Sequence, residues 1–451
     1  MKVLPVSQRV AFAVFAVVAL FFGLRGLLTM VDRIRSGRPD TDARTNAPWR
    51  RGWYALRTAI TQERVFRRRR VLSVFHAFIF YAFVLYVLVN ALDAIDGYVE
   101  LRNVLPGWMD ATYGMLTDAF SVLAIVGVVV FVLRRFVLPQ RRDFRFNERT
   151  LIAPRVRDGS MRRDSIFVAA FIVFHVGSRI VGNAAKLAEN GGDRWQPFGT
   201  WIAPFFAGAH AQAWREFGYW GALGSVLLFL SYFPYSKHAH LFMAPVKYFF
   251  HREVTSGELP PMEIDLEGEE SALGAGTIRE LSWPRLLDAY ACIQCNRCQD
   301  VCPASVTGKS LSPSALEINK RMVLNSSTEF ASNPPLLTAV LSEEATWACT
   351  TCGACLQVCP TENEPMLDIV DVRRQQVMVA GKFPAPLQAA FRGMERNGNP
   401  WGLAHDKRME WAEGLTVPTV EEVPEPDVLY WVGCAASFDP GAQKTARATV
   451  Q

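Results

Sequence analysis

The stretch Cys292-Ile-Gln-Cys-Asn-Arg-Cys-Gln-Asp-Val-Cys-Pro303 decides the organisation of this chain, and Cys349-Thr-Thr-Cys-Gly-Ala-Cys-Leu-Gln-Val-Cys-Pro360 repeats its spacing. Each run has the pattern Cys-x2-Cys-x2-Cys-x3-Cys-Pro, and together the runs hold eight of the nine cysteines. Short spacers let one loop aim three thiolates at a cube of iron and sulfur, and in two-cluster ferredoxins the fourth cysteine of each run reaches the other cube. The spacing therefore predicts two [4Fe–4S] clusters.

Crossed pairing assigns the ligands of the two clusters. The first cluster takes Cys292, Cys295, Cys298 and Cys359, and the second takes Cys302, Cys349, Cys352 and Cys355. Zinc sites and disulfides are the alternatives for the same cysteines. Zinc usually pairs separate Cys-x2-Cys units, and disulfides require an oxidising compartment, so both are less favoured than clusters.

The first 250 residues contain no cysteine and hold most of the long apolar runs of a chain that is 50% hydrophobic. A membrane-spanning helix needs about 20 mostly apolar residues. Five such segments are predicted, near residues 10–31, 71–92, 113–137, 165–185 and 217–235. This half of the chain is therefore expected to lie in a lipid bilayer.

Basic residues orient these segments. Arginines crowd the first and third connections, near residues 33–70 and 141–163, whereas the other two connections are acidic or mixed. Basic connections stay in the cytoplasm, so we expect an N-terminus outside the cell membrane and a cytoplasmic iron–sulfur domain. A cleaved signal peptide is the alternative for the first segment, but no A-x-A-like site follows it. The clustered net charge of +5 favours membrane orientation over nucleic-acid binding.

Histidines stand at matching depths in two of the predicted spans. His76 lies a few residues into the second span, and the fifth ends in Pro234-Tyr-Ser-Lys-His-Ala-His240. With the expected topology, both lie near the cytoplasmic surface. Two imidazoles that face each other across a helical bundle suit a b-type haem, and a snorkelling or hydrogen-bonded histidine is the alternative.

The fourth span carries a polar face, because His175, Arg179 and Asn183 recur at helical spacing. Asp118 of the third span lies at a similar depth, in the outer half of the bilayer. This set predicts a haem propionate site, a quinone pocket or a second haem bound through His175. A structural ion pair between Asp118 and Arg179 is an equally favoured alternative.

The remaining chain is predicted to be mostly helical around the cysteine runs. Ser312-Pro313 is typical of a helix start in the insert between the runs. Residues 428–433 have a buried-strand pattern that ends at Cys434, and one predicted helix follows. Because a strand and a helix cannot form a domain alone, we expect the chain to be C-terminally truncated.

His76 and the segment from Pro234 to Tyr248 resemble the haem-b membrane subunit of respiratory nitrate reductase, the gamma subunit, which has five helices. That family carries two haems. Here the second pair of ligand positions holds Tyr86 and Ala222. The resemblance therefore implies one cytoplasm-side haem b, bound by His76 and His240, with His238 as the alternative to His240.

The two cysteine runs, residues 395–402 and the segment around Cys434 resemble the heterodisulfide-reductase-type catalytic subunit. Nearly the whole chain is similar to fused membrane proteins described as electron-transfer-flavoprotein:menaquinone oxidoreductases. The resemblance implies a C-terminal pair of cysteine-rich CCG modules, opened here by Cys434 as a candidate ligand of a further cluster. It implies electron flow from electron-transfer flavoprotein, or another cytoplasmic redox donor, to menaquinone. A quinol-linked thiol-substrate reductase and a non-catalytic anchor and electron conduit are the alternatives.

The predicted organisation has five parts in a mostly α chain. Residues 1–250 form the transmembrane haem domain, 251–283 an acidic linker and 284–375 the two-cluster ferredoxin-type domain. Residues 376–427 form a helical and linker segment, and 428–451 the opening of an α/β CCG domain.

Overall fold

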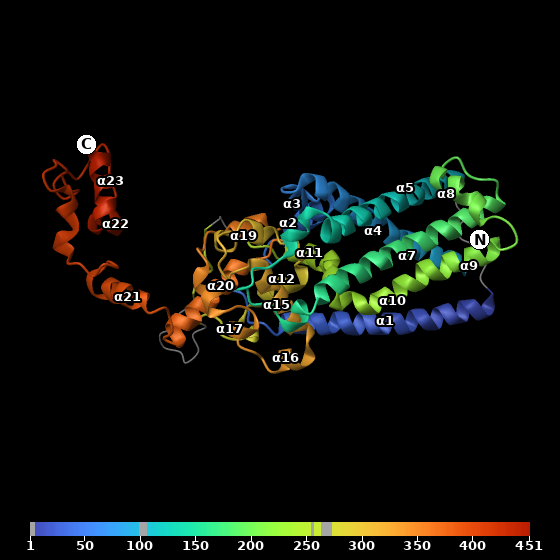
Figure 1. Cartoon of the computed structure of the whole chain (residues 1–451), viewed down its shortest axis with the longest axis horizontal. Helices are drawn as coiled ribbons and strands as arrows, with labels where there is room; N and C mark the ends of the chain where they lie inside the picture. The colour runs from blue at the N-terminus through green and yellow to red at the C-terminus, as the bar shows by residue number, and fades with distance from the viewer. Residues whose placement is uncertain (1–4, 99–105, 254–256, 263–272) are drawn as a thin grey trace. The chain divides into compact units, whose positions relative to one another are not determined.

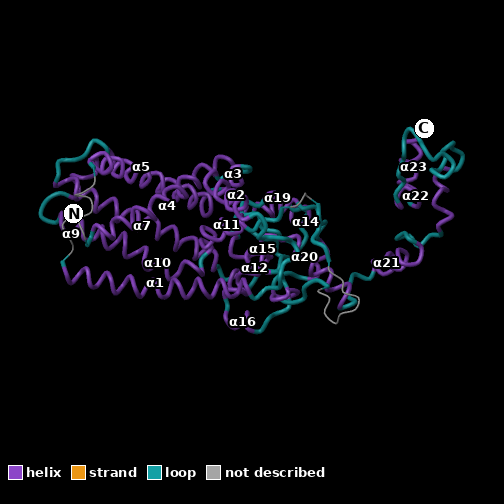
Figure 2. The backbone as a smooth tube through the Cα atoms, turned by 180° about the vertical axis from the view of Figure 1, so that it is seen from behind, coloured by secondary structure: helices purple, strands orange, loops and turns teal. Residues whose placement is uncertain are grey.

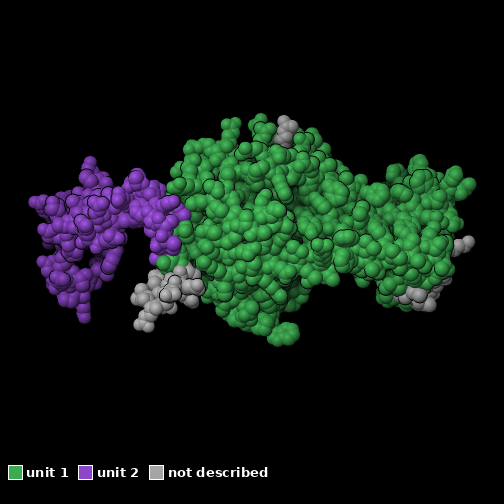
Figure 3. Space-filling model, turned by 90° about the horizontal axis from the view of Figure 1, so that it is seen from below, with its two compact units in different colours: residues 1–375 green, residues 376–451 purple. Residues whose placement is uncertain are grey.

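The computed structural model describes residues 5–98, 106–253, 257–262 and 273–451. The chain divides into two compact units, Met1–Gln375 and Gln376–Gln451 (Figure 3). The described residues form helices and isolated bridges, without a β-strand. The mostly helical class predicted from the sequence is confirmed.

Five long apolar helices lie side by side in the first unit (Figures 1 and 2). They are α1 (Val6–Arg35), α4 (Arg70–Asp96), α5 with its π-helical end η2 (Gly107–Val132, Leu133–Val137), α7 (Ser160–Glu189), and the run of α9, η5, α10 and η6 (Ala211–Tyr219, Trp220–Gly224, Ser225–Tyr232, Phe233–Tyr235). Each is long and apolar enough to cross a membrane, so the five predicted spans are confirmed.

Glycines bring α7 and α9 into backbone contact. Gly182 on α7 faces Gly218 on α9, and a Cβ added to Gly218 would lie 2.4 Å from the Cα of Gly182. Small residues allow such close approach of membrane helices, where apolar burial in itself drives little association. This contact fixes the position of α9 relative to α7, the helix that carries the polar face of the fourth span.

Short helices connect and cover the bundle. These are α2 (Pro48–Thr61), α3 (Glu63–Phe66), η3 (Pro139–Phe144), α6 (Pro154–Arg157), α8 (Pro197–Ile202), η4 (Ala203–Phe206), η7 (Lys237–Ala239) and α11 (His240–Phe249). Helix α11 packs on α2 and on α12 (Trp283–Ala291), the first long helix of the cysteine-rich part.

The cysteine-rich part lies at one end of the bundle (Figure 1). The short helix η8 (Ile278–Glu280) precedes α12. The helices after α12 are α13 (Arg297–Asp300), α14 (Pro303–Val306), α15 (Pro313–Asn325), α16 (Ser327–Ala331), α17 (Leu336–Ala339), α18 (Glu343–Ala348), α19 (Ala354–Val358) and α20 (Pro365–Arg374). One buried core joins Met30 of α1 and Met243 of α11 to Leu286 and Leu316 of this part. The bundle and the cysteine-rich part therefore share one core.

Part of the expected acidic linker belongs to this shared core. Ala275, Ile278 and Leu281 are fully buried in it. Residues 254–256 and 263–272 of the expected linker lie outside the described residues. Its described C-terminal end is thus a packed segment.

The second unit is helical as well. It contains α21 (Pro386–Asn397), η10 (His405–Ala412), α22 (Cys434–Phe438) and α23 (Pro440–Val450), and η9 (Gln375–Val379) precedes them. The buried strand expected at residues 428–433 is not formed, since Val428 and Trp431 are 83% and 87% exposed. A strand needs a neighbour to satisfy its backbone N–H and C=O groups, and the described residues of this unit supply none.

Candidate iron–sulfur and haem sites

The two cysteine loops have the same local conformation. Gln294 and Asn296 in the first loop, and Thr351 and Gly353 at the equivalent places in the second, have φ angles of 56°, 59°, 55° and 71°. In each loop, the residue two positions after the first cysteine donates its backbone N–H to that cysteine's sulfur at 3.4 Å. Left-handed turns at fixed places thus aim the thiols of each run inward.

Four thiols of the expected first cluster line one cavity. Cys292, Cys295 and Cys298 meet Cys359 there, and Cys355 borders the same space. Burial raises the pKa of the Cys359 thiol to about 12 and those of Cys292 and Cys298 well above the ordinary value. A bound cation reverses this effect and holds such thiols as thiolates, so the residues present fit an iron–sulfur cluster.

The thiols of the expected second cluster also group together. Cys355 interacts electrostatically with Cys349, Cys302 and Cys352. Cys302 and Cys355 are buried, whereas Cys352 is exposed, and the backbone N–H of Ala354 lowers its pKa. The fourth cysteine of each run thus stands among the thiols of the other run, as crossed pairing predicts.

The grouping of the cysteines bears on the two alternatives. All nine cysteines are free thiols. The eight thiols of the runs form two groups, in each of which three cysteines of one run meet the fourth cysteine of the other, whereas zinc usually pairs separate Cys-x2-Cys units. This arrangement favours clusters over zinc or disulfides.

The two expected haem ligands have one ring nitrogen anchored. His76 Nδ1 lies 2.9 Å from Gln62 Oε1, and His240 Nδ1 lies 2.9 Å from the carbonyl oxygen of Lys237. Histidines that bind metal are usually held in this way through the nitrogen away from the metal. Burial lowers the pKa of His240 to about 3, so its imidazole is neutral, which is the form that binds iron. These residues fit an axial pair that binds through Nε2.

His238 stands beside this pair. Its ring centroid is 5.9 Å from that of His240, and both rings interact electrostatically with His76. Its buried Nδ1 has no hydrogen-bond partner among the described residues. Because the His240 ring is oriented by a carbonyl and the His238 ring is not, the geometry favours His240 as the ligand.

The ion pair between Asp118 and Arg179, the structural alternative for this polar set, is not formed. Arg179 pairs with Asp93 of α4 and donates to the Tyr113 hydroxyl at 2.6 Å. Asp118 instead accepts the backbone N–H groups of Phe198 and Gly199 at 2.9 and 2.8 Å. The reason is that these two N–H groups at the start of α8 lack helical partners, and the carboxylate satisfies both.

His175 makes a hydrogen bond and a ring contact inside the bundle. Its Nδ1 donates to the carbonyl oxygen of Ala222 at 2.9 Å, and its ring meets the Tyr86 ring edge-on at 5.5 Å. The Tyr86 hydroxyl in turn lies 2.5 Å from Ser121 Oγ. Tyr86 and Ala222 hold the two positions where the resembling family has its second pair of haem ligands. Here both belong to a packed, hydrogen-bonded group around His175. No second histidine faces His175 among the described residues.

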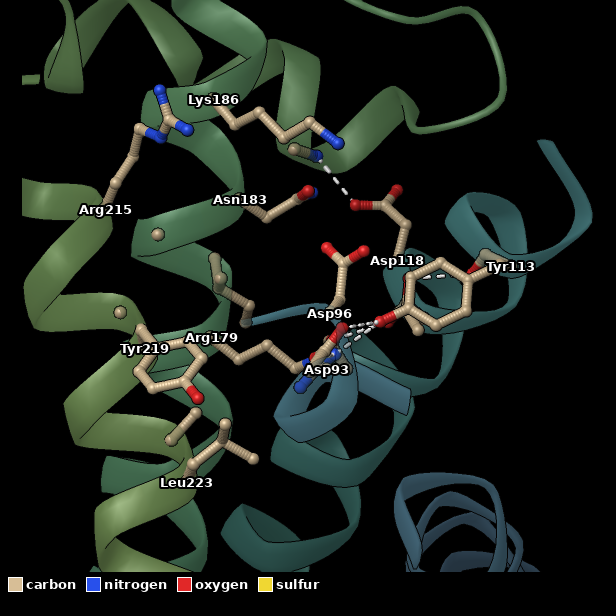
Figure 4. Close-up of a pocket in the computed structure, with 17 residues that line it drawn as sticks. Asp93, Asp96, Tyr113, Asp118, Arg179, Asn183, Lys186, Arg215, Tyr219 and Leu223 are labelled. Carbon is tan, nitrogen blue, oxygen red and sulfur yellow. Dashed lines mark hydrogen bonds and ion pairs between the residues drawn. The ribbon is translucent and has the colours of Figure 1, made fainter. Parts of the chain in front are cut away.

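A polar cavity of about 100 Å³ lies beside this group, in the half of the bundle away from the cysteines (Figure 4). Arg179 and Asn183 of the fourth span line it, together with Asp118 of the third span, whereas His175 is not among the lining residues. Asp93 and Tyr219 line it too and were not predicted as site residues. Asp93 and Asp96 are three residues apart, a spacing that puts both on one face of a helix. Both were assigned to a connection, because the second span was expected to end at residue 92.

The fold and these sites define a class. Five membrane-crossing helices carry, at one end, a module with two ferredoxin-type cysteine runs. The chain is a membrane iron–sulfur protein.

Comparison with known proteins agrees with this class. Residues 291–363 match the family model of the 4Fe-4S dicluster domain. The probable iron–sulfur-binding oxidoreductase FadF of Bacillus subtilis is 31% identical, over 85% of this chain and 59% of its own length. The EtfAB:quinone oxidoreductase of Syntrophomonas wolfei is 28% identical, over 88% of this chain and 59% of its own length.

A probable membrane-anchored ferredoxin of Chromohalobacter salexigens is 32% identical, over 42% of this chain and 31% of its own length. No solved structure matches the chain. The chain spans 59% of the length of the first two curated relatives. The resemblance to fused membrane iron–sulfur oxidoreductases found in the sequence is confirmed, and the chain is homologous to them.

Proposed function

We propose that this chain is an electron-transfer oxidoreductase. It passes electrons from a cytoplasmic donor, electron-transfer flavoprotein, through two [4Fe–4S] clusters and haem b to menaquinone. The names of the relatives support a redox role, and the order of sites along the structure supports this particular route.

The observation that carries the proposal is the contact between the first cysteine loop and the entrance of α4. Arg297, between two ligands of the first cluster, donates to the carbonyl oxygen of Val65 at 2.9 Å. Arg69 donates to the carbonyl oxygen of Cys295 at 3.2 Å. His76 follows one to two turns later on α4. The first cluster site therefore adjoins the haem site.

The second cluster site reaches the protein surface at one cysteine. Cys352 is exposed, whereas the four first-site cysteines are half-buried and the second-site Cys302 and Cys355 are buried. A donor that docks from water meets the second site first. The route supported by these positions runs from the donor to the second cluster, then to the first cluster, the haem and the quinone.

The cofactors, when bound, supply one-electron chemistry, and the chain orients them. Gln62 and the Lys237 carbonyl fix the two imidazoles. In the polar cavity, Arg179 and the Tyr219 hydroxyl are hydrogen-bond donors for quinone carbonyls. We therefore propose this cavity as the menaquinone site, on the side of the proposed haem site away from the clusters.

The membrane orientation is part of the proposal. The Arg-rich segments that contain Arg69 and Arg149 contact the cysteine-rich part, through Asp300 and Glu344. By the positive-inside rule these segments are cytoplasmic, which puts the clusters in the cytoplasm and the N-terminus outside, in the cell membrane.

The test uses the intact membrane protein in detergent. We expect about eight non-haem irons, two four-iron clusters by spin resonance and one low-spin haem by visible spectra. Reduced flavoprotein should reduce a menaquinone analogue through this protein. Cofactor binding without quinone reduction would leave the anchor and electron conduit as the function, and exterior labelling near residue 300 would contradict the route.

One observation favours the thiol-substrate alternative. Cys434 begins α22, and Arg408 Nη2 lies 3.5 Å from its sulfur. Reactive cysteines lie in electropositive, partly exposed surroundings, and Cys434 is half-buried beside this guanidinium. Reduction of a disulfide substrate by quinol, lost on Cys434→Ala, would establish this second function.

A further inference from the structure

Helix α15 runs from the first cluster site to residues 236–240, the turn that carries His238 and His240 and is called the histidine turn below. Ser314 and Glu317 line the same cavity as the first-cluster cysteines, and Arg321 follows one turn further along the same face. The Arg321 Nη1 donates to the carbonyl oxygen of Cys292 at 3.5 Å, and its Nη2 donates to that of Ser236. One guanidinium thus binds the main chain of both sites.

Ser236 connects this contact to the histidines. Its side chain caps η7 by accepting the backbone N–H of His238 at 3.1 Å, and η7 leads directly into His240. Asn325, at the end of α15, donates to the carbonyl oxygen of Tyr235 at 3.2 Å. The position of the histidine turn relative to the first cluster site is therefore set by α15.

Arg321 is also a buried positive charge. It is 1% exposed, and no carboxylate of the described residues lies within 4.0 Å of its guanidinium. The Tyr290 ring lies beside it, with its centroid 5.6 Å from Cζ. Asp164 interacts with it electrostatically, beyond ion-pair distance. A buried cation is costly without an anion close by. An iron–sulfur cluster with four thiolates and a haem with its propionates are both anionic groups of the kind that would balance it.

We propose that Arg321 is a positioning residue that couples the first cluster to the haem. It holds the Cys292 loop against the histidine turn, and its positive charge favours the reduced form of both centres. This inference rests on the proposed function, since it requires that both sites hold their redox groups.

The second cysteine run offers a matched control. Arg373 donates to the carbonyl oxygen of Cys349 at 2.6 Å, as Arg321 does to that of the equivalent Cys292, and to Thr351 Oγ1 at 3.1 Å. Among the described residues, Arg373 makes no hydrogen bond to the histidine turn, and its remaining hydrogen bond goes to the carbonyl oxygen of Thr346. Arg373 therefore binds the main chain of a cluster site, as Arg321 does, but does not bind the histidine turn.

The experiment compares Arg321→Gln, Arg321→Lys and Arg373→Gln in the purified full-length protein. Iron and haem contents are measured first, and the midpoint potentials of both clusters and the haem then follow from titrations read by spin resonance and visible absorbance. Arg321→Gln should lower the reduced-to-oxidised ratio of the first cluster and the haem by up to about tenfold at fixed potential, which is 59 mV for one electron.

Arg373→Gln should shift the second cluster alone. Arg321→Lys keeps the charge, so it should restore both potentials to near those of the wild type. If Arg321→Gln fails to retain its cofactors, the lysine variant decides, because a shift of either potential as large as tenfold with the charge kept would overturn the electrostatic role.

The outcomes separate this inference from the proposed function. A wild-type protein without clusters or haem refutes the proposed function. A wild type that holds all three centres, with unchanged haem and first-cluster potentials in Arg321→Gln, refutes the role of Arg321 alone. Equal haem shifts in Arg321→Gln and Arg373→Gln would also refute it, since they would show a general effect of lost charge.

Discussion

Glu364→Gln tests the junction between the membrane bundle and the cluster module. The carboxylate of Glu364 lies 2.8 Å from Arg285, 2.9 Å from Lys247 of α11 and 3.3 Å from Arg44. All four side chains are nearly or fully buried. Glutamine keeps the size of the side chain and removes its charge, so the change isolates the electrostatic contribution.

The cost follows from what remains in the network. Each of the three cations keeps at least one other carboxylate after the change: Asp368 for Arg285, Asp288 for Lys247, and Asp40 and Asp42 for Arg44. The substitution removes the one carboxylate that all three cations share, and removing one partner from a buried ion pair costs about 3–5 kcal/mol. For the unit Met1–Gln375, whose unfolding entropy is about 0.8 kcal/mol/K, that lowers the melting temperature by roughly 4–6 °C.

The assay is thermal unfolding in detergent, followed by tryptophan fluorescence and by release of the clusters. Glu344→Gln is the matched control, because it breaks an ion pair with Arg149 whose side chains are 51% and 63% exposed. Exposed pairs contribute about 0–1 kcal/mol. Equal melting temperatures for the two variants would refute the reasoning, since burial would then add nothing to the pair.

The pH dependence has a definite sign. Burial alone would raise the pKa of Glu364, but Arg285, Lys247 and Arg44 outweigh it and hold this pKa well below its usual range. The stabilisation is present above the unfolded-state pKa of about 4.5 and is lost as the pH falls through the folded-state value. The difference between wild type and variant should thus be constant near neutral pH and shrink only below about 4.5.

Three further predictions concern the sites. His76→Ala and His240→Ala should each remove the haem absorbance, whereas His175→Ala should retain it; haem loss in the last variant alone would show that the axial pair is wrong. Cys359→Ala should abolish the spin-resonance signal of the first cluster and leave the second, and loss of the second instead would disprove crossed pairing. Asp118→Ala should remove its bonds to two backbone N–H groups and cost about 0.5–2 kcal/mol, measured by melting temperature, with haem and iron contents unchanged.

Repeated cysteine spacing and hydropathy were sufficient to predict the cluster module and the membrane-spanning helices of this protein. Two identical cysteine runs predict two clusters because thiolate geometry restricts the spacers. Five apolar runs predict five spans because a bilayer requires backbone groups to be satisfied within each helix. These patterns are local in the sequence, so they can be recognised without knowledge of the packing.

Tertiary structure decided which distant groups meet. Arg179 pairs with Asp93 rather than Asp118 because α8 presents two unsatisfied N–H groups to Asp118. The contacts of Arg321 depend on α15 lying between two segments that are far apart in sequence. Residues 428–433 read as a strand but lack a partner. Pairing of side chains and of strands depends on neighbours in space, and a pattern along one chain does not specify them.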